Sequence, residues 1–252
     1  MKKLIGLAES LILLGIGLYM VYLSLSEAYI LFLNPRYRWL TGTAGGGLCI
    51  LALAGLWTRP NTVRPGRVLL FAVMAAIIAV FGQAPYINSS VNTDLIEQYE
   101  DPSPTLEHGG KTYTKINTGE LYFLANEGAD QEVFQDFAIR GQVGRTPELD
   151  QMGYFALLRV NFVCCAADAT AMGILVAYPD VRNLEPGQWV RVLGHPEVLN
   201  NPEKLPLPPI LNDAFYSTVS KKIVIQPDDV TPGYRPAKPY MFELSAEKPY
   251  NY

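Results

Sequence analysis

Hydrophobic positions divide the chain sharply near residue 85. Residues 1–85 are almost wholly apolar, whereas residues 86–252 alternate polar and apolar positions like a soluble domain. The apolar part contains three runs, at about 4–25, 40–57 and 68–84. Because a bilayer core needs roughly 20 apolar residues as helix, we interpret these runs as transmembrane helices. The pattern predicts a membrane-anchored α+β protein with N-terminal transmembrane helices.

Short strand patterns follow one another through residues 111–231. Five strands separated by turns, with a short helical piece between the second and third, are typical of a small OB-like β-barrel. The spacing is also compatible with another barrel of five or six strands. Residues 111–124 are expected to add a hairpin upstream. The predicted strands are 137–143, 154–163, 172–178, 188–194 and 222–226, and the helical piece is 166–170.

Two polar segments flank the predicted barrel. Residues 86–110 are rich in turn formers and read as a linker. Residues 232–252 contain four prolines and four tyrosines without periodicity. We interpret this segment as an extended aromatic and proline-rich tail, either disordered or lying on a partner.

Two sets of residues are candidates for partner binding. One set is glycines in the second apolar run, since glycine lets helices approach closely. The other is the set of aromatic residues in the tail. The candidates are Gly45, Gly46, Gly47, Tyr240, Phe242, Tyr250 and Tyr252.

Charge refines the picture in two ways. Five basic residues precede the first apolar run or lie between the second and third, and two lie between the first and second. Because basic loops stay in the cytoplasm, the N-terminus is expected there and the barrel on the outer side of the membrane. Residues 86–252 carry 13 basic and 22 acidic side chains, a net charge of −9. A nucleic-acid partner is therefore not expected, even though OB-like barrels often bind oligonucleotides.

Adjacent cysteines at the end of a predicted strand are the main chemical signal. Cys164 and Cys165 are followed by Asp168. Neighbouring strand side chains point to opposite faces, so the two thiols can converge only if the strand bends there. A helix starting at this point would supply the bend and lower the pKa of a thiol at its N-terminus.

Four interpretations of the cysteine pair are open. An oxidising compartment favours a vicinal disulfide. Two thiolates with Asp168, and with His195 or His108, would suit Zn²⁺ or Cu⁺. The pair could also be a redox thiol, or simply small buried apolar residues at a strand end. No catalytic motif occurs in the chain, which disfavours an enzyme.

Three segments carry a resemblance to a known family. They are Tyr29 to Trp39 with its Asn-Pro-Arg-Tyr core, residues 159–169 with the Cys-Cys-Ala-Ala-Asp-Ala stretch, and residues 187–194. With them the chain resembles the uncharacterised YcgQ-like family of permease-associated bacterial membrane proteins. The resemblance implies a bacterial inner (plasma) membrane location, an exported periplasmic domain, a partner permease and a link to metal handling.

The sequence favours a non-catalytic, membrane-anchored accessory subunit of a permease or larger membrane complex. Its exported OB-like domain would carry the Cys-Cys site. The alternative is a thiol-based metal-binding or redox protein, with Zn or Cu held by Cys164, Cys165 and Asp168.

Overall fold

A computed structural model describes most of the two regions that the hydrophobic pattern separates. The chain divides into two compact units, residues 1–87 and 88–252. The predicted third span at 68–84 lies outside the described residues, as does most of the predicted linker. The described residues are 2–58, 103–127, 134–200, 202–211, 214–233, 235–236, 238–244 and 248–252.

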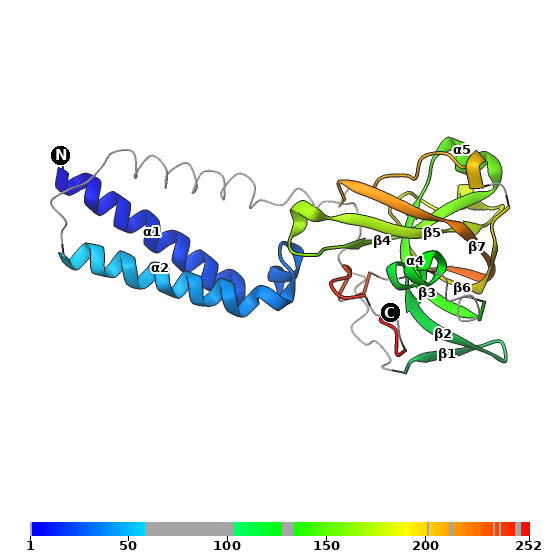
Figure 1. Ribbon diagram of the computed structural model, residues 1–252, viewed down its shortest axis with the longest axis horizontal. Coiled ribbons are helices and arrows are strands. Elements are labelled where there is room, and N and C mark those ends of the chain that lie inside the picture. The colour runs from blue at the N-terminus through cyan, green and yellow to red at the C-terminus, as the bar shows by residue number, and fades with distance from the viewer. Residues whose placement is uncertain are drawn as a thin grey trace. The chain divides into compact units, whose positions relative to one another are not determined.

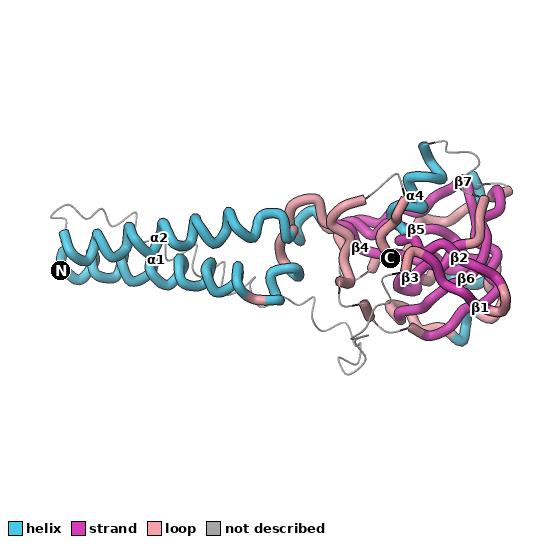
Figure 2. Tube along the Cα trace, turned by 90° about the horizontal axis from the view of Figure 1, so that it is seen from below, coloured by secondary structure: helices cyan, strands magenta, loops and turns pink. Residues whose placement is uncertain are grey.

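The first unit contains two long helices that run side by side (Figures 1 and 2). They are α1 (Lys2–Leu25) and α2 (Arg38–Thr58), which confirms helices at the first two predicted spans. Two short 3₁₀ helices, η1 (Glu27–Leu31) and η2 (Pro35–Tyr37), connect them. Both long helices are long and apolar enough to cross a membrane.

Small residues set the packing between these helices. A Cβ built on Gly45 would lie 2.8 Å from the Gly17 carbonyl oxygen and 2.9 Å from Cβ of Met20. A Cβ on Gly17 would equally meet Cys49 Sγ, at 2.8 Å. The side chain of any other residue would push the helices apart, so these glycines permit the close approach of α1 and α2.

Five strands of the second unit close into a barrel (Figure 1). They follow the order β3-β4-β5-β7-β6, and β6 pairs back onto β3. The β5–β7 pair is parallel, while the other four pairs of the ring are antiparallel. The predicted five-stranded barrel is thus confirmed. Its strands are β3 (Phe137–Gly144), β4 (Tyr154–Asn161), β5 (Thr170–Ala177), β6 (Trp189–Val198) and β7 (Tyr216–Pro232).

Apolar side chains that alternate along the strands fill the barrel. They form one cluster of buried residues with α4 (Thr118–Glu127) packed against it. Two short helices, α5 (Pro147–Met152) and η5 (Val181–Asn183), lie in the loops that follow β3 and β5. Fully buried members of the cluster include Ile139, Phe155, Leu157, Ile174, Val192 and Ile225.

The segment before the barrel differs from its prediction. The hairpin expected over 111–124 is wrong, because α4 begins at Thr118. The hairpin is instead β1 (Thr105–His108) and β2 (Lys111–Asn117), so β1 lies within the range predicted as linker. Its two turn residues, Gly109 and Gly110, have φ of 58° and 79°, which glycine adopts without strain.

Strand β7 extends beyond its predicted end at residue 226. Pro227 cannot donate a ladder hydrogen bond, and proline inside a strand is usually found at a bulge. Here it lies at a bulge, because the register against β6 shifts by one residue at this point. Leu193 pairs with Asp229 and Gly194 pairs with Pro227, so Asp228 is the extra residue of a bulge. The strand continues beyond the bulge, and the Asp228 side chain bonds to Lys111 and Tyr113 of β2.

The described part of the C-terminal tail lies on the barrel of its own chain. Met241 forms a parallel bridge with Asn161, and the backbone N–H of Asn251 donates to Glu120, in α4, at 2.8 Å. The Tyr252 ring lies under Arg140, whose guanidinium carbon is 4.4 Å from the ring centroid. The tail therefore contributes to the fold of the second unit.

Candidate functional site

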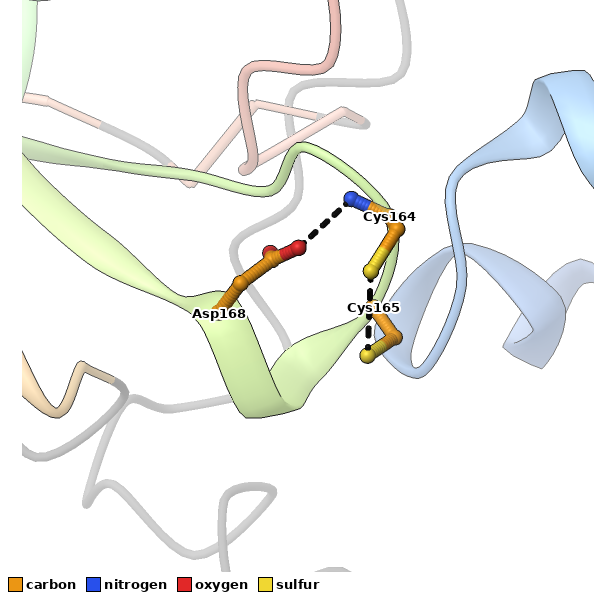
Figure 3. A group of neighbouring side chains, drawn as sticks. All are labelled: Cys164, Cys165 and Asp168. Carbon is orange, nitrogen blue, oxygen red and sulfur yellow. Dashed lines mark hydrogen bonds between the residues drawn. The ribbon is translucent and has the colours of Figure 1, made fainter.

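The cysteine pair lies in the loop that joins β4 to β5 (Figure 3). After β4 ends at Asn161, the chain bends and then forms a 3₁₀ helix, η4 (Ala166–Asp168). The bend brings the two sulfurs to 3.5 Å from each other, as the strand-end argument requires. Both cysteines are free thiols, and Cys164 is exposed while Cys165 is half-buried. The interpretation as buried core residues is therefore wrong.

Asp168 organises this loop through its carboxylate. One oxygen accepts the backbone N–H of Val163 at 3.0 Å, and the other accepts that of Cys164 at 2.7 Å. Figure 3 shows the carboxylate facing the Cys164 backbone across the bend. The three potential ligands, Cys164, Cys165 and Asp168, have donor atoms within 4.8 Å of one another.

The electrostatics of the loop follow from this arrangement. The hydrogen bond with Asp168, and then that with Cys165, raises the pKa of the Cys164 thiol to about 12. The expected lowering of that pKa by a helix start is wrong, since η4 has only three residues and the nearest charge is a carboxylate. Burial would raise the pKa of Asp168, but hydrogen bonds from the Cys164 side chain and neighbouring backbone N–H groups outweigh it and lower that pKa. The resting loop thus holds a neutral Cys164 thiol beside an ionised carboxylate.

The C-terminal tail anchors the start of the loop. The Met241 N–H donates to the Val160 carbonyl at 2.8 Å, and the Phe162 N–H donates to the Met241 carbonyl at 2.9 Å. The buried Phe162 ring stacks on Tyr240, with centroids 4.5 Å apart, and meets Phe242 edge-on. Phe162, two residues before Cys164, is therefore held by a distant part of the chain.

Arg159 strengthens the same anchor from within β4. Its buried guanidinium donates to the carbonyl of Lys238 at 2.6 Å and to that of Pro239 at 3.2 Å. An arginine in a strand pattern gave no sequence signal of this role, because its partners are backbone carbonyls about eighty positions later.

Neither histidine lies in the cysteine group. His195 instead meets Asp136 and Asp228, again with ligand atoms within 4.8 Å. His108 lies 4.0 Å from Asp229. The expectation that His195 or His108 completes the cysteine site is wrong, because both lie where β6, β7 and the β1–β2 hairpin meet.

A cation already occupies the neighbourhood of this second group. The Lys111 ammonium lies 3.0 Å from Asp228 Oδ2, and the Tyr113 hydroxyl donates to the same oxygen at 2.9 Å. The bond from Lys111 dominates over burial and lowers the pKa of Asp228. The group is therefore a satisfied ion pair, and the cysteine loop is the better candidate for a metal.

The residues predicted to bind a partner divide into packed and open ones. Gly45 packs against α1, while a Cβ on Gly46 or Gly47 would have no heavy atom within 4 Å. Tyr240 and Tyr250 are buried in the chain's own barrel unit. Partner binding through Phe242, Tyr252 or any of these residues stays a prediction.

Exposed apolar side chains lie at the start and at the end of the cysteine loop, a feature that the strand pattern did not reveal. Val163, 72 % exposed, directly precedes the cysteines. Phe215 and Tyr216, 53 % and 74 % exposed, begin β7 beside the end of the loop. The Phe215 N–H donates to the Ala169 carbonyl, and Tyr216 pairs with Thr170. We call Val163, Phe215 and Tyr216 the apolar flank.

Comparison with known proteins gives one match. The model of the DUF1980 C-terminal domain family matches residues 129–243, a range that covers the barrel, the cysteine loop and the part of the tail that anchors it. No curated protein and no solved structure matches the chain. The barrel unit is thus similar to the domain of an uncharacterised family.

Proposed function

We propose that this protein is a non-catalytic, membrane-anchored accessory protein whose barrel binds a thiophilic metal ion, Zn²⁺ or Cu⁺. The observation that carries the proposal is the pair of free sulfurs 3.5 Å apart on an exposed loop. Thiolates are the ligands that these ions favour. A negative carboxylate beside them further favours a cation.

A redox role has less support from the same geometry. Thiols that exchange disulfides have lowered pKa values, because the thiolate is the attacking species. The Asp168 carboxylate instead raises the pKa of Cys164. A thiol kept neutral exchanges disulfides slowly, and a metal ion has to displace the same proton, so metal affinity is expected to increase with pH.

The barrel supports an OB-like assignment. Numbered along the chain, its strands close in the order 1-2-3-5-4-1, with strands 3 and 5 parallel. OB-fold barrels have five strands in a partly open Greek-key arrangement. Since fold does not determine function, the proposal rests on the cysteine loop and not on this resemblance.

Membrane anchoring and a permease partner complete the proposal. Support comes from the two apolar helices, α1 and α2, and from the resemblance to the YcgQ-like family. The basic residues of the N-terminal region favour a cytoplasmic N-terminus, and the apolar run at 68–84, taken as a third span, would then place the barrel on the extracytoplasmic, periplasmic side. A metal-binding barrel at that surface would serve as an accessory subunit to a membrane transporter.

Metal binding by the full chain in detergent tests the proposal. Titration with Zn²⁺, and with Cu⁺ under reducing conditions, should show tight binding to the wild type. The double variant Cys164→Ser/Cys165→Ser should bind at least about 100-fold more weakly, because even loss of a residue that only supports a ligand costs 10–100-fold. Cys49→Ser, which removes the thiol in α2, is the matched control and should bind normally.

Intact mass under non-reducing conditions separates the alternatives. Free thiols with no metal affinity would overturn the metal site. A mass about two units below that of the reduced chain would point to a vicinal disulfide instead.

A further inference from the structure

One copy of the chain supplies only part of a coordination sphere at the cysteine loop. Among the described residues, no histidine, glutamate or third cysteine joins Cys164, Cys165 and Asp168 in that group. Both Asp168 oxygens already accept backbone N–H groups that shape the loop. A structural zinc site has four ligands, so two further donors have to come from elsewhere.

The spacing of the sulfurs indicates where those donors would sit. With Zn–S bonds of about 2.3 Å, two sulfurs of a tetrahedral site are about 3.8 Å apart. The observed 3.5 Å between Cys164 Sγ and Cys165 Sγ is close to one edge of such a tetrahedron. Cys164 is exposed, which leaves the opposite edge accessible to another molecule.

We propose that two copies of this chain share one metal ion, each contributing Cys164 and Cys165. The proposal rests on the metal binding proposed above and names the source of the missing ligands. A two-fold axis through the ion places the second sulfur pair on the opposite edge of the tetrahedron, and such isologous contacts are the commonest in soluble oligomers. The site is incomplete without the second copy.

The surroundings of the loop suit a second copy. In the apolar flank, Val163 directly precedes the ligands, and Phe215 and Tyr216 lie against Ala169 and Thr170 at the end of the same loop. All three side chains are exposed, and a two-fold contact at the loop would cover them. Aromatic residues are enriched at the centres of protein interfaces. Copies anchored in one membrane are confined to the same surface, which raises their effective concentration for each other.

The test uses the full chain in detergent with Cys49→Ser, so that the only thiols are those of the loop. Zinc content and molar mass are measured with added Zn²⁺ and after chelation. The expected result is a zinc-dependent dimer with one ion per two chains and an X-ray absorption spectrum of four sulfurs at about 2.3 Å. One ion per chain in a monomer, with oxygen or nitrogen in the coordination shell, would overturn the shared site but leave metal binding intact. Absence of zinc binding would instead overturn the proposed function itself.

A matched pair of variants tests the contact without touching a ligand. Val163→Glu places a charge in the apolar flank and should weaken the dimer at least tenfold. Val198→Glu, at a 63 % exposed valine at the end of β6, should leave the dimer unchanged. Equal effects of the two substitutions, or none from Val163→Glu, would contradict the proposed interface.

Discussion

Two groups of potential metal ligands in the barrel unit differ in what already surrounds them. The cysteine loop and the Asp136–His195–Asp228 group each bring three donor atoms within 4.8 Å. In the second group, Lys111 and Tyr113 already bond to Asp228. In the loop, Asp168 accepts two backbone N–H groups, and among the described residues the groups that lower its pKa include no lysine or arginine. Proximity of the donor atoms therefore does not distinguish the two groups, whereas the ligand type and the charges already bonded to the ligands do.

The two groups also differ in how they are held. His195 pairs with Gln226 in the β6–β7 ladder, and Asp228 is the bulge residue of the same strand pair. The cysteine loop depends on Asp168 and on a tail that begins more than sixty residues later in the chain. The loop can therefore be disturbed from a distance.

The largest expected effect comes from the tail. Tyr240→Ala removes a buried ring that stacks on Phe162 and should lower the free energy of unfolding by about 3 kcal/mol. Hydrogen exchange should speed up most at the Phe162 amide, while the Lys111 end of the barrel stays protected. Tyr240→Phe, which keeps the stacked ring, is the control. Uniform loosening of both regions would contradict the specific anchoring of the loop.

A smaller effect is expected from the loop carboxylate. Asp168→Asn keeps one acceptor oxygen but removes the charge beside the Cys164 thiol. The pKa of Cys164 should fall from about 12 toward its ordinary value, since the bond with Asp168 is its main cause. Alkylation of Cys164 at pH 8 should then be faster than in the wild type. An unchanged alkylation rate would show that Asp168 does not control the thiol.

Lys111→Met tests whether the Lys111 ammonium is what keeps the Asp136–His195–Asp228 group from binding a metal ion. Removal of its charge frees Asp228 beside His195. A second zinc site should then appear, with a weaker affinity than the cysteine loop because its ligands are exposed. The gain should vanish in Lys111→Met/His195→Ala. If wild-type protein already binds zinc at His195, the comparison between the groups is wrong.

The smallest effect is a pH dependence at Asp228. Because the bond from Lys111 lowers the pKa of Asp228 in the folded state, its stabilisation is present above pH about 4 and disappears as the pH falls through that lowered pKa. The pair is partly exposed, so solvent screening should keep this contribution small. The stability difference between wild type and Asp228→Asn should therefore shrink as the pH falls from 5 to 2. A constant difference across this range would exclude the titration of Asp228 as its cause.

Much of the fold was predictable because its signals are local. Helices at the first two apolar runs and strands rich in apolar and branched residues depend on residues close in the chain. The Cys164–Cys165 site was also visible, since neighbouring cysteines need only a bend to converge. The β1–β2 hairpin was missed even though Gly109 and Gly110 marked its turn, because the polar composition around them favoured a linker.

Other features depend on contacts between distant segments. The register bulge that places Asp228 beside His195 arises only when β7 pairs with β6. The bonds from Arg159 to the carbonyls of Lys238 and Pro239 could not be predicted from the sequence, because every residue has a backbone carbonyl.

The sequence by itself determined the apolar N-terminal region, the strands of the barrel unit and the adjacent thiols. Each follows from hydrophobic periodicity or from residues that are adjacent in the chain, and neither depends on the tertiary fold. Only the tertiary structure decided that the barrel closes through β3 and β6, that the tail anchors the cysteine loop and that neither histidine joins it. These outcomes depend on which surfaces are buried against one another, and that is set by contacts between segments far apart in the chain.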